Sequence, residues 1–307
     1  MKRDYINEKD WKPQEISEIL DLAAKVKAKP RDFRSALAGK TLAMIFEKSS
    51  TRTRVSFEAG MFQLGGLAMF LSSRDLQIGR GEPISDTARV LSRYADGIMA
   101  RTYAHATVEE LGRASSVPVI NGLSDLLHPC QALADFQTVR ERFGSVEGFP
   151  LCYIGDGNNV AHSLLITGAK LRARVTVVTP EGFEPLSEVL GWAREAAQQT
   201  GGEVRTSHSV EEGVRGARAV YTDVWASMGQ EEEAAARAAK FEPYRVTSRV
   251  FALAQPDAIF LHCLPAHRGE EVDAAVIDGP ASAIYDQAEN RLHAQKALLL
   301  RLVGSGA

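Results

Sequence analysis

One run of hydroxyl and guanidinium side chains in this sequence is suited to binding a phosphate. The five residues from Ser50 to Arg54 stand between a short apolar run and a segment with helical spacing. A helix N-terminus offers unpaired N–H groups and the positive end of the helix dipole. A simple helix cap would explain a single Ser or Thr, but the whole run favours anion binding. Arg52 and Arg54 face different ways on a helix, and we expect Arg54 to pair with Glu58.

The same half of the chain holds a second group of polar residues at predicted strand ends. Arg101 follows an apolar run, and His128 and Gln131 flank the start of a predicted helix that Pro129 would open. An imidazole and an amide there could polarise a carbonyl or stabilise an oxyanion. Taken singly, the Arg is more often a surface charge and the His is more often structural. The Walker pattern is absent, which disfavours a nucleotide triphosphatase.

The second half contains a glycine pattern that supports a different class of enzyme. Gly155–Ala161 follows a predicted strand and resembles a dinucleotide fingerprint, with Glu181 as the candidate ribose partner. This pattern supports a nicotinamide-dependent dehydrogenase as a rival interpretation. Asp156 would place a carboxylate beside a pyrophosphate, and the side chains of Asn158 and Asn159 stand where close backbone approach is wanted. The motif alone therefore has limited weight.

Three more polar groups follow in the second half. Asp223 could pair with an ammonium group, although a turn or helix-cap Asp is the ordinary alternative. His262, Cys263 and His267 have side chains that could bind a metal. The familiar zinc spacings need a second ligand pair, however, and the sequence has none. We therefore expect no metal. Arg291 lies in the segment that opens the last helix, and it is locally as compatible with a surface position as with a functional one.

Composition excludes several classes. The 307 residues are 45% hydrophobic and 24% charged with a net charge of -3, an ordinary globular balance for two domains or one large one. No long basic run suggests a nucleic-acid surface. Cysteine use indicates a reducing compartment, since the only cysteines are Cys130, Cys152 and Cys263. The first residues lack a signal peptide's apolar core and the charge-free stretch 59–73 is too short to span a bilayer, so we expect a cytoplasmic protein.

The elements that must position these residues alternate between strands and helices. In the first half the expected strands are 41–46, 68–71, 97–100 and 117–120, and the expected helices are 13–26, 53–64, 85–94, 107–114 and 130–143. In the second half the expected strands are 151–154, 174–178, 219–221 and 258–261, and the expected helices are 160–171, 185–199 and 288–303. Residues 144–150 are the predicted linker. This pattern predicts an α/β protein of two domains, each a parallel sheet flanked by helices.

Eight segments in order resemble the aspartate/ornithine carbamoyltransferase superfamily, and within it the ornithine-specific members. They are Ser50–Arg54, Gln77–Gly79, Ala100–Thr102, His128–Gln131, Gly155–Asn159, Asp223–Gly229, His262–Ala266 and Glu289–His293. The resemblance implies transfer of a carbamoyl group from carbamoyl phosphate to ornithine, giving citrulline and phosphate. It also implies no cofactor and a homotrimer with shared sites. Carbamoyl transfer to another amine, such as putrescine, stays open as an alternative.

The resemblance carries roles to individual residues. It implies carbamoyl-phosphate binding by Ser50, Thr51, Arg52, Thr53, Gln77, Arg101, His128, Pro129, Cys130, Gln131, Cys263, Leu264 and Arg291. It implies ornithine binding by Asn159, Asp223, Ser227 and Met228, and catalytic roles for Arg101, His128 and Cys263. Gln77 belongs to a loop that in the family reaches the neighbouring subunit's site.

The resemblance also implies a division of the chain. Residues 1–144 would form the carbamoyl-phosphate-binding domain, joined by the C-terminal helix 289–307, and residues 145–288 the ornithine-binding domain. Relatives selective for aspartate carry a lysine near position 77 and lack the Asp-x-x-x-Ser-Met-Gly motif. This chain has no lysine between Lys48 and Lys170, and it has that motif at Asp223–Gly229.

Overall fold

The computed structural model describes residues 2–226 and 234–304. The chain separates into two compact units, Met1–Gln137 with Glu289–Ala307 and Thr138–Ala288. The separation falls inside helix α5 (Pro129–Phe143) and inside helix α12 (Ile284–Val303). Within the described part of the chain, each helix is too short or too polar to cross a membrane.

The first unit is built on a parallel sheet in the order β2-β1-β3-β4. Its strands are β1 (Thr41–Phe46), β2 (Leu67–Ser72), β3 (Gly97–Arg101) and β4 (Val119–Leu123). The central strands β1 and β3 are almost entirely buried, as their apolar sequences predict, whereas the edge strand β2 is partly exposed. Parallel pairing aligns the strand ends, and Phe46 of β1 therefore lies beside Arg101 of β3.

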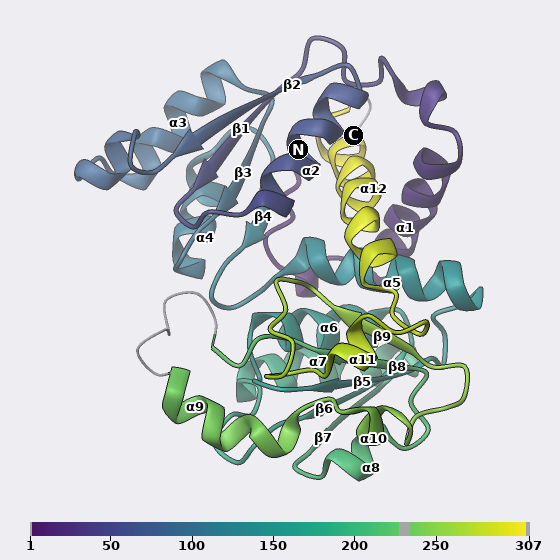
Figure 1. Ribbon diagram of the computed structural model, residues 1–307. Coiled ribbons are helices and arrows are strands. Elements are labelled where there is room, and N and C mark those ends of the chain that lie inside the picture. The colour runs from purple at the N-terminus through teal and green to yellow at the C-terminus, as the bar shows by residue number, and fades with distance from the viewer. Residues whose placement is uncertain (1, 227–233, 305–307) are drawn as a thin grey trace. The chain divides into compact units, whose positions relative to one another are not determined.

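Helices cover both faces of this sheet (Figure 1). They are α1 (Pro13–Ala28), α2 (Thr51–Gln63), α3 (Ile84–Tyr94), α4 (His105–Ala114), part of α5 and most of α12, with short 3-10 turns η1 (Glu8–Asp10), η2 (Pro30–Phe33) and η3 (Gln77–Arg80). On one face, Ala43 and Ile45 pack against Ala88 of α3 and Leu111 of α4.

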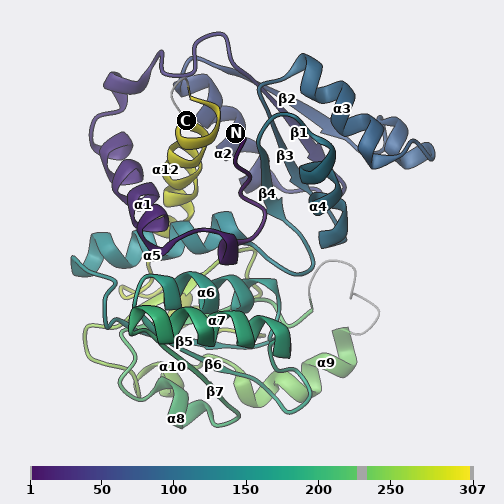
Figure 2. The same ribbon diagram turned by 180° about the vertical axis from the view of Figure 1, so that it is seen from behind.

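The C-terminal helix α12 packs on the first unit, as the resemblance implied. A Cβ at Gly60 of α2 would lie 3.3 Å from Cγ of Lys296, and one at Gly97 would lie 3.0 Å from Cγ2 of Val303. These close approaches place α12 against both α2 and the start of β3. Figures 1 and 2 show α12 beside α1 and α2 from opposite sides. Residues far apart in the sequence thereby share one site, as described below.

The second unit is a five-stranded parallel sheet in the order β7-β6-β5-β8-β9. Its strands are β5 (Pro150–Ile154), β6 (Arg174–Val178), β7 (Glu203–Ser207), β8 (Ala219–Thr222) and β9 (Ile259–His262). Its helices are α6 (Asn159–Lys170), α7 (Ser187–Thr200), α8 (Val210–Val214), α9 (Ala234–Phe241), α10 (Ser248–Phe251) and α11 (Ala274–Ile277), with the 3-10 turn η5 (Glu242–Tyr244). Helices α6 and α7 lie side by side (Figure 2).

The predicted fold class is confirmed, with two parallel sheets flanked by helices. The sequence missed strand β7, because Glu203 and Arg205 break the apolar pattern on which strand prediction depends. As an edge strand, β7 exposes these side chains instead of burying them. The last helix begins at Ile284, earlier than the predicted position 288.

Candidate functional site

In the first unit, the run of hydroxyl and guanidinium side chains forms the beginning of α2. Ser50 is the N-cap, and its Oγ accepts a hydrogen bond from the Thr53 N–H over 3.2 Å. Ser50 therefore acts as the helix cap that was one of its two expected roles. Thr51 and Arg52 are the first helical residues, and they stand where the dipole of α2 favours an anion.

Arg54 turns away from this group, as expected. Its Nε donates to Oε1 of Glu58 over 3.0 Å, one turn along α2. Its guanidinium carbon lies 3.8 Å from the ring centroid of Phe70 on β2. The predicted Arg54–Glu58 pair is thus confirmed, and it directs this arginine to the outer surface.

Arg291 joins three helices of the first unit. Its guanidinium is buried, with Nη1 donating to Oε1 of Gln131 over 2.7 Å and Nη2 donating to Oγ1 of Thr53 over 3.3 Å. Its Nε donates to Oε1 of Gln295, one turn along α12, over 3.1 Å. The structure therefore brings together Thr53, Gln131 and Arg291 from α2, α5 and α12. Gln295 carried no signal in the sequence beyond its spacing from Arg291.

Buried Asp135 fixes the orientation of the Gln131 amide. Gln131 Nε2 donates to Asp135 Oδ1 over 2.8 Å, which leaves Oε1 to accept from Arg291. Sequence reasoning missed Asp135. Its spacing of four residues from Gln131, on the same face of α5, is the signal that could have identified it.

His128 lies at the electrostatic centre of the first unit's group. Burial lowers the pKa of His128 well below its ordinary value, and the charges of Arg291, Arg101 and Arg52 lower the pKa further. The ring is therefore a neutral imidazole at physiological pH. The three arginines that the sequence analysis selected all act on this one side chain. Arg101, the last residue of β3, is itself buried.

The residues that follow His128 differ in position. Pro129 is the first residue of α5, as predicted. Cys130 is fully buried, its Sγ lies 3.4 Å from the carbonyl oxygen of Asn121, and burial raises the pKa of this thiol to about 12. Cys130 is therefore a neutral thiol in the interior rather than a nucleophile.

Gln77 is exposed in η3, after the edge strand β2.

In the second unit, Asp223 follows the end of β8 and is nearly buried. Its Oδ2 accepts from Asn158 Nδ2 over 2.9 Å, and its Oδ1 accepts from the Val224 N–H over 2.8 Å and from the Cys263 thiol at 3.0 Å. The structure thus joins the predicted residues Asp223 and Cys263. Asn159 is the first residue of α6, and Asn158, which the sequence analysis did not select, is the residue that holds Asp223.

Leu264, next to Cys263, has an unusual backbone. Its φ of 59° lies in the left-handed region, and a cis peptide bond joins it to Pro265. Left-handed backbone costs a non-glycine residue about 1–2 kcal/mol, so neighbouring contacts must hold this segment. Ser227 and Met228, the other predicted ornithine-binding residues, lie outside the described residues.

Among the described residues of the second unit, two groups hold side chains with the chemistry of metal ligands. In the first, Asp223, His262 and Cys263 offer ligand atoms within 4.8 Å of one another. These atoms already take part in hydrogen bonds inside the unit, including the Cys263–Asp223 contact. The second group, which contains Glu271, holds the exposed His267 beside that buried carboxylate.

The dinucleotide-like turn serves a packing role instead. A Cβ at Gly157 would lie 2.3 Å from the Pro185 nitrogen and 2.5 Å from the Phe183 carbonyl oxygen. The Gly157 N–H donates to that same carbonyl over 2.8 Å. In a dinucleotide site this glycine admits a pyrophosphate, but here it admits the chain's own backbone. Asp156 forms an ion pair with Arg237. These contacts disfavour the dehydrogenase alternative.

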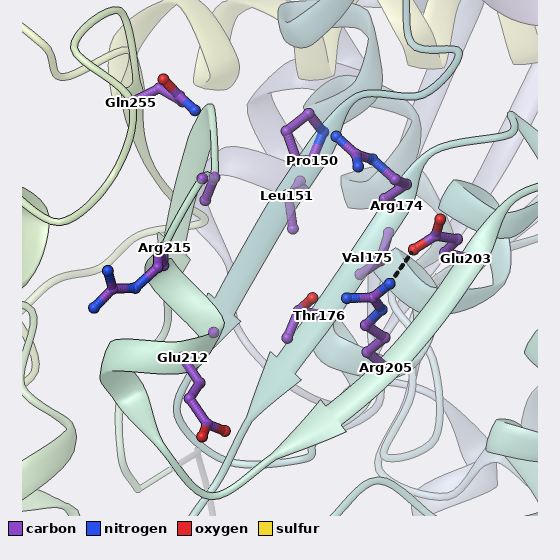
Figure 3. A pocket seen from close by; sticks show the side chains of 13 residues that line it. Pro150, Leu151, Arg174, Val175, Thr176, Glu203, Arg205, Glu212, Arg215 and Gln255 are labelled. Atoms are coloured by element: carbon purple, nitrogen blue, oxygen red, sulfur yellow. Dashed lines mark ion pairs between the residues drawn. The ribbon is translucent and has the colours of Figure 1, made fainter.

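A groove in the second unit lies at the amino ends of the strands, whereas Asp223 and Cys263 follow carboxyl ends (Figure 3). Pro150, Arg174 and Glu203, the first residues of β5, β6 and β7, line it together with Arg205 and Arg215. Asp223 and Cys263 follow the carboxyl ends of β8 and β9, where ligands of parallel sheets gather. The groove is therefore separate from the polar group around Asp223.

The chain is similar to known carbamoyltransferases over almost its whole length. Residues 3–141 match the family model for the aspartate/ornithine carbamoyltransferase carbamoyl-P binding domain, and residues 147–302 match the model for the Asp/Orn binding domain. An ornithine carbamoyltransferase of Thermococcus kodakarensis is 54% identical over 98% of this chain and 96% of its own length. An anabolic ornithine carbamoyltransferase of Pyrococcus furiosus is 55% identical over 98% and 95%. The solved ornithine carbamoyltransferase of Pyrococcus furiosus superimposes with a TM-score of 0.96, at 54% identity and 99% and 98% coverage.

Proposed function

The chain belongs to the aspartate/ornithine carbamoyltransferase family, and from this premise we propose that it is a carbamoyltransferase that acts on L-ornithine. The reaction converts carbamoyl phosphate and L-ornithine into L-citrulline and phosphate, a step of arginine biosynthesis. One observation carries the proposal in physical terms. Arg52 in the first turn of α2, buried Arg101 and buried Arg291 all lower the pKa of buried His128, and three guanidinium groups around one point suit a doubly charged acyl phosphate.

The two units divide the substrates between them. Residues 1–144 with 289–307 bind carbamoyl phosphate, and residues 145–288 bind ornithine. The match of the two family models to residues 3–141 and 147–302 supports this assignment. The return of α12 to the first unit supports the inclusion of Arg291 among the carbamoyl-phosphate residues.

In the first unit, the phosphate is held by the start of α2 and by arginines. The N–H groups and side chains of Ser50–Thr53 supply donors at a positive helix end. The carbamoyl carbonyl accepts from Arg101, Thr53 and His128, which stabilise the oxyanion of the tetrahedral intermediate. A neutral His128 can donate a hydrogen bond to the carbamoyl oxygen and, having no charge, does not form an ion pair with the phosphate.

In the second unit, Asp223 and Asn159, with Ser227 and Met228, bind the α-amino and carboxylate ends of ornithine. The nearly buried carboxylate of Asp223 suits an ammonium group. Cys263 orients the attacking side-chain amine. That amine resembles a Lys amine with a pKa of about 10.4, so at pH 8 roughly one molecule in a few hundred is neutral and able to attack. Carbamoyl phosphate has a good leaving group, so these residues need neither a metal nor a covalent nucleophile.

The enzyme is a homotrimer in which a second copy covers the exposed edge of the first unit. Edge strand β2 and helix α2 leave Phe62 81%, Leu67 60% and Phe70 37% exposed, and Gln77 follows that strand. Unpaired edges with large apolar side chains are typical of interfaces. Sedimentation equilibrium tests this point, since Leu67→Lys should give monomers, and a monomeric wild-type chain would contradict it.

A citrulline assay tests the function. Purified protein with carbamoyl phosphate is given ornithine, putrescine, N-acetylornithine or aspartate, and we expect turnover with ornithine alone. Turnover of putrescine without turnover of ornithine would reassign the acceptor. We also propose a cytoplasmic location, which the low number of cysteines supports because disulfides are rare in that compartment.

A further inference from the structure

The residue before Cys263 is a buried histidine that pairs with a buried glutamate, and the reaction described above uses neither of them. His262 is the last residue of β9, and Glu271 follows nine residues later in the sequence. Neither side chain has exposed surface, and His262 Nε2 lies 3.2 Å from Glu271 Oε1. Burial of an ionisable pair costs free energy unless each partner forms hydrogen bonds with the other. A structural role of this pair would offset that cost.

The hydrogen bonds of His262 define its tautomer. Its Nδ1 lies 2.8 Å from the backbone nitrogen of Leu264, and an N–H can only donate. Nδ1 is therefore the acceptor, and the ring proton is on Nε2, where it is donated to Glu271 Oε1. Protonation of both nitrogens would remove the acceptor that Leu264 uses. The imidazole thus holds the backbone two residues along the chain while Glu271 holds the imidazole.

Glu271 ties down the other end of the same segment. Its Oε1 also accepts from the His267 N–H over 2.6 Å. One carboxylate oxygen therefore receives a donor from the residue before Cys263 and a donor from the end of the following turn. Between these two points, Leu264 has its left-handed φ of 59°.

We propose that His262 and Glu271 are positioning residues that hold Leu264 in its left-handed backbone and thereby aim the Cys263 thiol at Asp223. Cys263 lies in the sequence between His262 and Leu264, which a hydrogen bond joins, so its backbone is restrained on both sides. The result is the contact of 3.0 Å between Sγ and Asp223 Oδ1. The inference rests on the proposed function only for its consequence, which is the orientation of ornithine by Cys263 and Asp223.

Alkylation of Cys263 tests the geometry without reference to catalysis. Cys130 and Cys152 are buried, and burial raises the pKa of both thiols, so iodoacetamide reports on Cys263. His262→Asn keeps an acceptor near the Nδ1 position, whereas His262→Gln reaches toward Glu271 but lacks that acceptor. A thiol that donates to a carboxylate stays protonated, and the thiolate is the reactive form. We expect alkylation of His262→Gln about tenfold faster than wild type, because the displaced thiol no longer donates to Asp223.

The conservative variant and a second position complete the test. We expect the alkylation rate of His262→Asn to stay near wild type, and Glu271→Gln to behave like it because the amide oxygen still accepts. Glu271→Leu, which removes the acceptor, should alkylate fast and serves if His262→Gln does not fold. His162→Gln is the control, since buried His162 also accepts a backbone N–H, from Leu186 over 3.1 Å, in the same unit. Wild-type alkylation rates in His262→Gln and Glu271→Leu, or equal changes in His262→Asn and His262→Gln, would overturn the proposal.

The kinetic consequence is measured separately. In the citrulline assay, His262→Gln should lower kcat/KM for ornithine by about 10- to 100-fold, the range expected for a misplaced reacting group, and His262→Asn should recover most of it. If wild-type protein makes no citrulline, the proposed function fails while the alkylation comparison still decides the positioning role. If citrulline is made and His262→Gln has wild-type kcat/KM, the positioning proposal fails alone.

Discussion

Arg291 on α12 donates a hydrogen bond of 2.7 Å to Gln131 on α5, and the same guanidinium reaches Thr53 on α2. A single buried cation therefore sets the relative positions of three side chains from three helices of the first unit. The bond also fixes the Gln131 amide between Arg291 and Asp135. Removal of this cation is the most direct disturbance of the proposed carbamoyl-phosphate site.

Arg291→Gln should weaken carbamoyl-phosphate binding. Hydrogen bonds to a charged group contribute about 1.5–3 kcal/mol, which is roughly 10- to 150-fold in affinity. Isothermal titration calorimetry measures the change. Arg301→Gln is the matched control, because Arg301 lies on the same helix in an exposed ion pair with Glu18 at 3.5 Å. Equal affinities of the two variants would contradict the role of Arg291.

Arg52→Gly should abolish detectable carbamoyl-phosphate binding, since it removes a cation from the start of α2 and near His128. Arg54→Gly on the same helix is the control, because that arginine pairs outward with Glu58 and such exposed pairs contribute little. Both substitutions place a glycine in the same helix, so a comparison of the two separates charge from helix stability. Near-normal affinity of Arg52→Gly would end the assignment.

Asp223→Asn should raise the KM for ornithine by at least about tenfold, because a nearly buried carboxylate would no longer face the α-ammonium group. The affinity for carbamoyl phosphate should stay within about twofold, as the first unit holds that substrate. Steady-state kinetics with each substrate varied in turn measures both effects. Asp257→Asn, which removes an exposed carboxylate paired with Arg218, should leave both constants unchanged. An unchanged KM in Asp223→Asn would contradict the role of this carboxylate.

Acid should destabilise the protein partly through His128. Its pKa is lowered in the folded state by burial and by Arg291, Arg101 and Arg52, so below pH 6.5 the unfolded chain binds a proton that the folded protein does not. The stability present above pH 6.5 is therefore lost as the pH falls toward the folded pKa, by up to about 1.4 kcal/mol per pH unit. Urea unfolding at several pH values should show that the free energy of unfolding falls less steeply with decreasing pH in His128→Gln than in wild type. Equal slopes would indicate a His128 pKa near its ordinary value.

The activity at low ornithine concentration should rise about tenfold per pH unit between pH 6.5 and 8, because the neutral fraction of an amine with a pKa near 10.4 rises by that factor. His128 should add no ionisation step in this range, since its pKa is lowered well below 6.5. Initial rates across this range test the prediction. A plateau beginning near pH 6.5 would show that another group limits the reaction.

The sequence by itself determined the fold class and most of the polar residues at strand ends. Local patterns carry that information: the apolar run of β1 is nearly all buried, and Ser50 caps α2 as its type predicts. Parallel strands align their carboxyl ends, so Arg101 and Asp223 could be selected from their place after an apolar run. The edge strand β7 was not predicted from the sequence, because an exposed strand need not be apolar.

Only the tertiary structure decided which of these side chains meet. The bond from Arg291 to Gln131 depends on the return of α12 to the first unit, which no local spacing encodes. Gly157 resembled a nucleotide-binding residue in sequence, but the backbone of Phe183–Pro185 occupies the space beside it. The reason in each case is that side-chain environment depends on contacts between distant segments, whereas sequence pattern reports only on near neighbours. His262 follows the same rule. In the sequence it resembled a metal ligand, whereas in the structure it is buried, pairs with Glu271 and binds the backbone next to Cys263.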